Sequence, residues 1–182
     1  MRENGPWKIK SSAAKYKSEL IDVYEDEVIK PNGEPSTYST VRVKAGVSVL
    51  PVDDDGFVYL ARDFRYAIGR ECVEAVAGAI DEGEEREDAA RRELKEELGI
   101  EAADVVELGL VDPMPSLVDS PSYLFLAKGR LKFKEKELEG GENIKTVKVK
   151  LSEAVRMVMR GDITHGSSCV VILRANDYLN RG

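Results

Sequence analysis

Alternating apolar and polar residues, interrupted by turns, run through much of the chain. This alternation places successive side chains on opposite faces of the backbone and is typical of half-buried β-strands. The pattern predicts strands at residues 20–29, 38–50, 57–62, 74–80, 105–111, 122–127 and 144–151. Turn-forming runs, KPNGE at 30–34 and DDDG at 53–56, separate the first three of these strands.

Helices are expected in three places. Residues 85–98 are dominated by Ala, Leu, Glu, Lys and Arg and contain no Pro, and Gly99 follows where a helix C-cap would fall. Two further helices are expected at 152–160 and 168–180, with Ser152 and Ser168 suited to cap their first turns. A chain of mostly strands, with two of its helices late in the sequence, predicts an α/β fold in which a mixed sheet carries helices on both faces.

The helix at 85–98 would collect carboxylates along one edge. Glu93 and Glu97 lie one turn apart, and Glu96 lies beside them. We expect no cation among them, so that a hard divalent ion would turn their repulsion into coordination. The alternative is a solvated, charge-rich face, which is the commoner meaning of such a run. A neighbouring apolar stripe can face a core: Ala90, Leu94 and Leu98.

Composition narrows the class of protein. A chain of 182 residues suits one domain with a small appendage. Its net charge of −7 argues against a general nucleic-acid binder or a partner of anionic membranes. No apolar leader or spanning run is visible, so we expect a cytoplasmic protein. The single histidine, His165, cannot anchor a multi-histidine metal site and is expected to be structural.

A long motif lies between Gly78 and Ile100. It reads G-x5-E-x7-R-E-U-x-E-E-x-G-U with every fixed position filled, U being a bulky aliphatic residue. The motif resembles the signature of the Nudix hydrolases, which cleave a nucleoside diphosphate linked to another group. The resemblance implies a Nudix-type α/β/α sandwich over residues 41–182. It also implies structural roles for four motif positions, with the arginine paired to a glutamate: Gly78, Glu84, Arg92 and Gly99.

The resemblance also implies a metal site. Mg²⁺, with Mn²⁺ as a substitute, would be bound mainly by Glu93 and Glu97, with Glu96 in support and the backbone carbonyl of Ala77 completing the set. Glu96 and Glu97 are thereby catalytic candidates as well as ligands. In the relevant branch of the family a glutamate on a late glycine-rich loop acts as base or as an additional ligand. Glu142 is the candidate here, with Glu139 and a merely solvated loop glutamate as alternatives.

Residues outside the motif resemble the ADP-ribose pyrophosphatase branch. Arg65 matches an arginine that contacts substrate there, although a surface salt bridge would also explain it. Pro115 lies sixteen residues after Gly99, as in enzymes that act on ADP-ribose-type substrates, although a proline can simply shape a loop. Two residues depart from the branch, Ser116 where glycine is usual and Val76 where proline is usual.

The N-terminal segment resembles an additional antiparallel β module, assigned to residues 1–40, which in relatives pairs across a two-fold axis. Trp7 could stack on adenine, or could simply anchor the packing of this segment. A homodimer is expected, because such a module alone would expose strand edges.

The resemblance therefore implies a metal-dependent hydrolase of a small nucleoside diphosphate sugar, with no nucleic-acid or membrane partner. The expected reaction converts ADP-ribose and water into AMP and ribose 5-phosphate. GDP-mannose or another nucleoside diphosphate sugar is the first alternative. A sensor that binds ADP-ribose without cleaving it is the second, although all the motif glutamates are present.

Overall fold

The computed structural model describes residues 1–138 and 143–181. The chain divides into two compact units, the first formed by Met1–Lys44 with Asp112–Pro121 and the second by Ala45–Val111 with Ser122–Gly182. In the described part of the chain, no helix has the length and apolar character needed to cross a membrane. The assignment of residues 1–40 to a dimerisation module and of 41–182 to a hydrolase domain stays a prediction.

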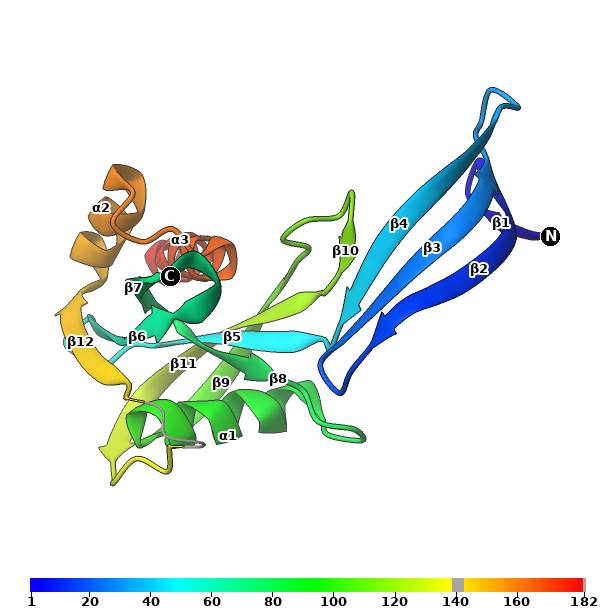
Figure 1. Ribbon diagram of the computed structural model, residues 1–182. Coiled ribbons are helices and arrows are strands. Elements are labelled where there is room, and N and C mark those ends of the chain that lie inside the picture. The colour runs from blue at the N-terminus through cyan, green and yellow to red at the C-terminus, as the bar shows by residue number, and fades with distance from the viewer. Residues whose placement is uncertain (139–142, 182) are drawn as a thin grey trace. The chain divides into compact units, whose positions relative to one another are not determined.

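The first unit is a five-stranded sheet in the order β1-β2-β3-β4-β10 (Figure 1). Its strands are β1 (Arg2–Asn4), β2 (Trp7–Lys17), β3 (Ile21–Ile29), β4 (Pro35–Val43) and β10 (Val118–Asp119). Neighbouring strands are antiparallel except for β10, which pairs in parallel with β4. The alternation did not predict β1 and β2 as individual strands of the β module expected at 1–40, because their residues are largely polar and exposed.

The second unit holds a four-stranded mixed sheet, a three-stranded antiparallel sheet and the helices. The mixed sheet has the order β8-β5-β11-β9, formed by β8 (Val76–Ala79), β5 (Gly46–Pro51), β11 (Ser122–Phe133) and β9 (Ile100–Val111). The smaller sheet has the order β12-β6-β7, formed by β12 (Lys145–Lys150), β6 (Phe57–Arg65) and β7 (Arg70–Glu74), with a 3-10 turn at Tyr66–Ile68. The helices are α1 (Arg86–Leu98), α2 (Leu151–Arg160) and α3 (Gly166–Asn180).

Helices cover both faces of the mixed sheet, as Figure 1 shows, because the buried side chains of β11 alternate. Phe125 and Ala127 pack in one core with α1, whereas Leu124 and Leu126 pack in a second core with α2 and α3. This period of two is what a strand buried on both faces requires. The predicted α/β sandwich with a mixed sheet is confirmed.

Several predicted boundaries were wrong. The strand expected at 38–50 is two strands, since β4 ends at Val43 and β5 starts at Gly46. Ser152 and Ser168 are not N-caps: Lys150 and His165 hold those positions, and neither caps with its side chain. Ser168 instead accepts a hydrogen bond from the backbone N–H of Ala75, which takes its hydroxyl away from the helix end.

Candidate active site

One cavity of about 280 Å³ in the second unit gathers the residues of the sequence motif. It lies where β8 runs beside α1, and the elements that line it come from far apart in the sequence. Most of the residues predicted for metal or substrate binding in this unit share the cavity. Its lining is Arg65, Ala77, Gly78, Ala79, Asp81, Arg92, Glu93, Glu96, Glu97 and Ile144.

Helix α1 presents its carboxylates to this cavity because its opposite side is fixed in the core. Ala90, Leu94 and Leu98 are buried against the mixed sheet, which settles the rotation of the helix about its axis. The helix ends at Gly99, which takes a left-handed conformation (φ +65°) and donates to the carbonyl oxygens of Leu94 and Lys95. A Cβ at Gly99 would also lie 2.2 Å from the carbonyl oxygen of Lys134. Both the left-handed backbone and this close approach therefore require glycine at position 99.

Gly78 allows α1 to approach β8 closely. A Cβ built at Gly78 would lie 1.9 Å from both Cδ and Oε1 of Glu93, a separation that real side chains do not reach. The absence of a side chain at Gly78 therefore gives the Glu93 carboxylate its place in the cavity. This glycine acts through the neighbouring glutamate rather than through its own backbone angles.

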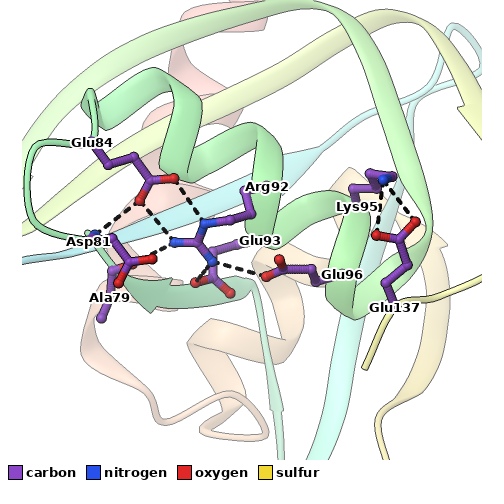
Figure 2. Close-up of polar contacts among 8 residues, drawn as sticks. All are labelled: Ala79, Asp81, Glu84, Arg92, Glu93, Lys95, Glu96 and Glu137. Carbon is purple, nitrogen blue, oxygen red and sulfur yellow. Dashed lines mark hydrogen bonds and ion pairs between the residues drawn. The ribbon is translucent and has the colours of Figure 1, made fainter. Parts of the chain in front are cut away.

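Arg92 lies at the centre of the carboxylates (Figure 2). Its Nε and Nη2 donate to Glu84 at 2.9 and 3.0 Å, and Nη2 also donates to the carbonyl oxygen of Ala79 at 2.9 Å. Its Nη1 donates to Glu93 at 2.8 Å and to Glu96 at 3.0 Å. The expectation that no cation lies among the carboxylates was wrong, because an arginine one residue before Glu93 and four before Glu96 can reach both.

These contacts shift the pKa values of Arg92 and Glu84. Hydrogen bonding to Glu84 is the first cause that raises the pKa of Arg92, and the bond from Arg92 lowers the pKa of Glu84 below its ordinary value. Glu84 in turn accepts from the backbone N–H of Asp81 at 3.0 Å, which ties the loop before α1 to the helix. Glu84 is thus one of three glutamates that pair with Arg92 in the described part of the chain.

The donors in the cavity suit a divalent ion of the Mg²⁺ type. Three carboxylates and the segment of Ala77 supply hard oxygen donors, and the space over Gly78 is kept for one of them. In the described residues no ready-made group of three or more acidic, histidine or cysteine ligands is present. Arg92 Nη1 donates to one oxygen each of Glu93 and Glu96, and these bonds turn the two carboxylates toward the arginine.

Arg65 enters the same cavity from the end of β6. It forms a salt bridge with Glu74, at 2.7 Å from Nη2 to Oε2, and its Nη1 lies 3.5 Å from Asp63. The bond to Glu74 is the first cause that raises the pKa of Arg65, to which the charge of Glu97 adds. The salt bridge that the sequence left open for Arg65 is present, and the contact with substrate stays a prediction, for a residue that lines the cavity.

The segment after β11 adds a residue that the sequence did not single out. Glu137 donates its backbone N–H to the carbonyl oxygen of Glu96, and its side chain pairs with Lys95 (Figure 2). The preceding Lys136 donates from Nζ to the carbonyl oxygen of Ile144 at 2.8 Å. Burial lowers the pKa of Lys136, while the charge of the buried Glu97 acts in the opposite direction. The candidate base Glu142 and its alternative Glu139 lie outside the described residues.

A second cavity, of about 400 Å³, lies within the first unit and contains both Trp7 and Pro115. The rings of Trp7 and Tyr38 meet edge to face, with centroids 5.5 Å apart and planes at 78°. The Tyr38 hydroxyl donates to the carbonyl oxygen of Ser116 at 2.5 Å, which holds the 112–121 segment to the sheet. Asp26 also lines this cavity, and its Oδ1 is buried without a hydrogen-bond partner among the described residues.

A cavity of hard oxygen donors and arginines on an α/β sandwich is the arrangement of a metal-dependent enzyme that acts on phosphate groups. The NUDIX domain model matches residues 42–165, and the chain belongs to this family of hydrolases. Enzymes of this family generally use divalent metal ions.

Similar proteins agree with this assignment. An ADP-ribose pyrophosphatase from Bacillus subtilis (strain 168) is 31% identical over 158 residues, which cover 86% of this chain and 85% of that protein. A methanol dehydrogenase activator from Bacillus methanolicus is 25% identical over the same length, with the same shares covered. A crystal structure of an ADP compounds hydrolase shares the fold, with a TM-score of 0.85 at 22% identity, covering 100% of this chain and 98% of that one.

Proposed function

We propose that this enzyme hydrolyses the pyrophosphate bond of ADP-ribose and releases AMP and ribose 5-phosphate. The observation that carries the proposal is the cavity in which Glu93, Glu96 and Glu97 meet two arginines, because a diphosphate substrate needs both metal ligands and cationic donors. The similarity to a protein named ADP-ribose pyrophosphatase, over most of both chains, supports the choice of substrate.

In the proposed site Mg²⁺, or Mn²⁺ in its place, is held by Glu93 and Glu97 with Glu96 and the Ala77 carbonyl in support. When bound, the ion lowers the pKa of a water molecule and withdraws charge from the phosphoryl oxygens. Arg65, which lines the same cavity, binds a phosphate of the substrate. Arg92 has a structural role, since its bonds to Glu84 and Ala79 join the motif loop to α1. Glu142 stays the proposed base or additional ligand.

The cavity of the first unit is the proposed site for adenine. Trp7 and Tyr38 offer aromatic surface, and Pro115 with Ser116 closes one wall. The buried Oδ1 of Asp26 is an acceptor that an amino group of a base would satisfy. This combination of stacking surface and acceptor fits a nucleobase better than it fits a sugar alone.

We also propose a cytoplasmic homodimer. The long strand β2 pairs with β1 over Trp7–Ile9 alone, so most of its outer edge has no partner strand within the described chain. Such an edge favours a second copy of the same chain as its neighbour. Light scattering at micromolar concentration tests this part, and a mass equal to one chain would contradict it.

A substrate panel tests the proposed function. ADP-ribose, GDP-mannose, ADP-glucose, NADH and diadenosine polyphosphates are each incubated with the enzyme and Mg²⁺, and the products are identified. The proposal expects ADP-ribose to be cleaved with the highest kcat/KM. Preference for GDP-mannose would favour the first alternative substrate. Binding of ADP-ribose without cleavage would favour a sensor and overturn the enzymatic proposal.

A further inference from the structure

Glu74 is a buried carboxylate that none of the motif chemistry requires. It closes β7 and its side chain is only 6% exposed. In the register of β6 and β7, Ala61 is the direct partner of Glu74. Arg65, at the end of β6, therefore has to extend its side chain back along the sheet to reach Glu74. The two residues are thus joined through their side chains alone.

The geometry of this pair is bidentate. Arg65 donates from Nε to both carboxylate oxygens of Glu74, at 3.1 and 3.3 Å, and from Nη2 to Oε2 at 2.7 Å. Two parallel bonds of this kind fix the plane of a guanidinium as well as its position. Nη1 is the remaining nitrogen, and it stands 3.5 Å from Asp63, beyond a normal hydrogen bond.

A second set of contacts fixes the residue that follows Glu74. The backbone N–H of Ala75 donates to Ser168 Oγ at 2.9 Å, and Ser168 Oγ lies 2.8 Å from His165 Nδ1. Because the serine oxygen already accepts from Ala75, its hydroxyl can donate to His165. Glu74 lies 3.5 Å from the same Nδ1, which in this arrangement has no proton to donate to the carboxylate. The residue next to Glu74 is therefore tied to the start of α3.

Stability alone explains this arrangement poorly. Burying a carboxylate carries a desolvation penalty that its ion pair often only balances. Arg65 is the partner whose side chain stays 41% exposed, and it lines the cavity that contains Glu93, Glu96 and Glu97. Glu74 therefore constrains the direction of the Arg65 side chain at the wall of the cavity more than it stabilises the fold.

We propose that Glu74 is a positioning residue, which holds the Arg65 guanidinium in the orientation that binds a phosphate of the substrate. The identity of that anion rests on the function proposed above. Glu74 itself touches no reacting atom. Its effect on the enzyme passes through Arg65.

Steady-state kinetics on ADP-ribose test this role with Glu74→Gln, Arg65→Gln and the double variant. Glu74→Gln keeps the shape of the side chain and is expected to raise KM about tenfold while kcat stays within about twofold. The double variant is expected to match Arg65→Gln, because the effects of two residues that act through one contact are not additive.

The KM of Glu74→Asp, which keeps the charge, should lie between those of the parent and Glu74→Gln. Glu71→Gln on the same strand is the control, since Glu71 is exposed, and it should leave KM unchanged.

An independent readout reports the pairing itself. The Nε–Hε signal of Arg65 in a ¹H–¹⁵N spectrum, assigned by its loss in Arg65→Gln, should be protected from exchange in the parent and in Glu71→Gln. It should lose that protection in Glu74→Gln. Unchanged KM in Glu74→Gln with the protection lost would overturn the proposal, as would KM effects that multiply in the double variant. If Glu74→Gln fails to fold, Glu74→Asp carries the same comparison.

The two proposals can fail separately. If the parent does not cleave ADP-ribose, the proposed function fails, and the variants are compared by calorimetric binding of an analogue with a methylene group in place of the bridging oxygen. The same order of dissociation constants would still support the role of Glu74. If the parent does not bind this analogue either, both proposals fail. If the parent cleaves ADP-ribose and Glu74→Gln behaves like Glu71→Gln, the positioning role alone fails.

Discussion

The carboxylate of Glu93 lies over the Cα of Gly78, so closely that a Cβ at Gly78 would stand 1.9 Å from Glu93 Cδ. The obstructing group is the end of a flexible side chain, so a methyl group at Gly78 would displace the carboxylate rather than the backbone. We predict that Gly78→Ala folds normally and loses about tenfold or more in kcat/KM, because a metal ligand is moved. Thermal melting and steady-state kinetics check the two halves of the prediction.

Gly166→Ala is the matched control, because a Cβ at Gly166 meets no atom within 4 Å. It should leave both the melting temperature and the activity close to those of the parent. Full activity in Gly78→Ala would show that Glu93 needs no such place.

Trp7 tests the proposed adenine cavity. Loss of its ring in Trp7→Ala should raise KM for ADP-ribose about tenfold, because stacking of one base on an aromatic side chain is worth about 1–3 kcal/mol. Tyr16→Ala is the control on the same strand, since Tyr16 is exposed and lies outside the cavity. Equal KM values for the two variants would place adenine elsewhere.

The contacts of Arg92 lead to a prediction of how Mg²⁺ changes the melting temperature. In the parent Arg92 donates to one oxygen each of Glu93 and Glu96, whereas in Arg92→Gln the two carboxylates lack that cation and repel one another until an ion binds. Arg92→Gln should therefore melt at a lower temperature than the parent without Mg²⁺ and gain more from added Mg²⁺. Arg91→Gln serves as control, because Arg91 bonds Glu87 and the carbonyl oxygen of Ala102 instead. A gain from Mg²⁺ no larger than that of the parent would contradict this account of Arg92.

The burial of His165 leads to a prediction of how stability depends on pH near neutrality. Burial is the first cause that lowers its pKa below the ordinary 6.5, so the unfolded chain takes up a proton before the folded chain does. Stability is therefore complete above about pH 6.5 and falls as the pH drops through the lowered value. His165→Asn should flatten the melting temperature between pH 7.5 and 5.5, since the chain has no other histidine. Parallel curves for parent and variant would refute this assignment.

Local signals in the sequence predicted the elements of the site well. The composition of residues 85–98 and the glycine that follows them predicted α1 and its left-handed end, because both depend on neighbours along the chain. The contacts of Arg92 with Glu93 and Glu96 were missed, since like-charge spacing on a helix does not reveal which way a nearby arginine turns.

Contacts that depend on strand register could not be predicted from the sequence. Arg65 reaches Glu74 through its long side chain although the register of β6 and β7 places Ala61 opposite Glu74 and Arg70 opposite Arg65, and no local pattern specifies this contact. Pro115 shares a cavity with Trp7 because the 112–121 segment returns to the first sheet through β10, a parallel pairing with β4 across a long stretch of sequence. Sequence spacing identified these residues one by one, and only the fold shows which of them meet.

Turnover of ADP-ribose by Glu97→Gln, measured as release of AMP in the presence of Mg²⁺, tests the metal-site account most directly. Glu97 is 7% exposed and lines the cavity beside Glu93 and Glu96. We predict equal amounts of AMP and ribose 5-phosphate from the parent, and a fall of about a hundredfold or more in the variant with an unchanged fold. Glu87→Gln, on the exposed side of the same helix, should retain the activity of the parent. Near-normal turnover by a folded Glu97→Gln would contradict the account.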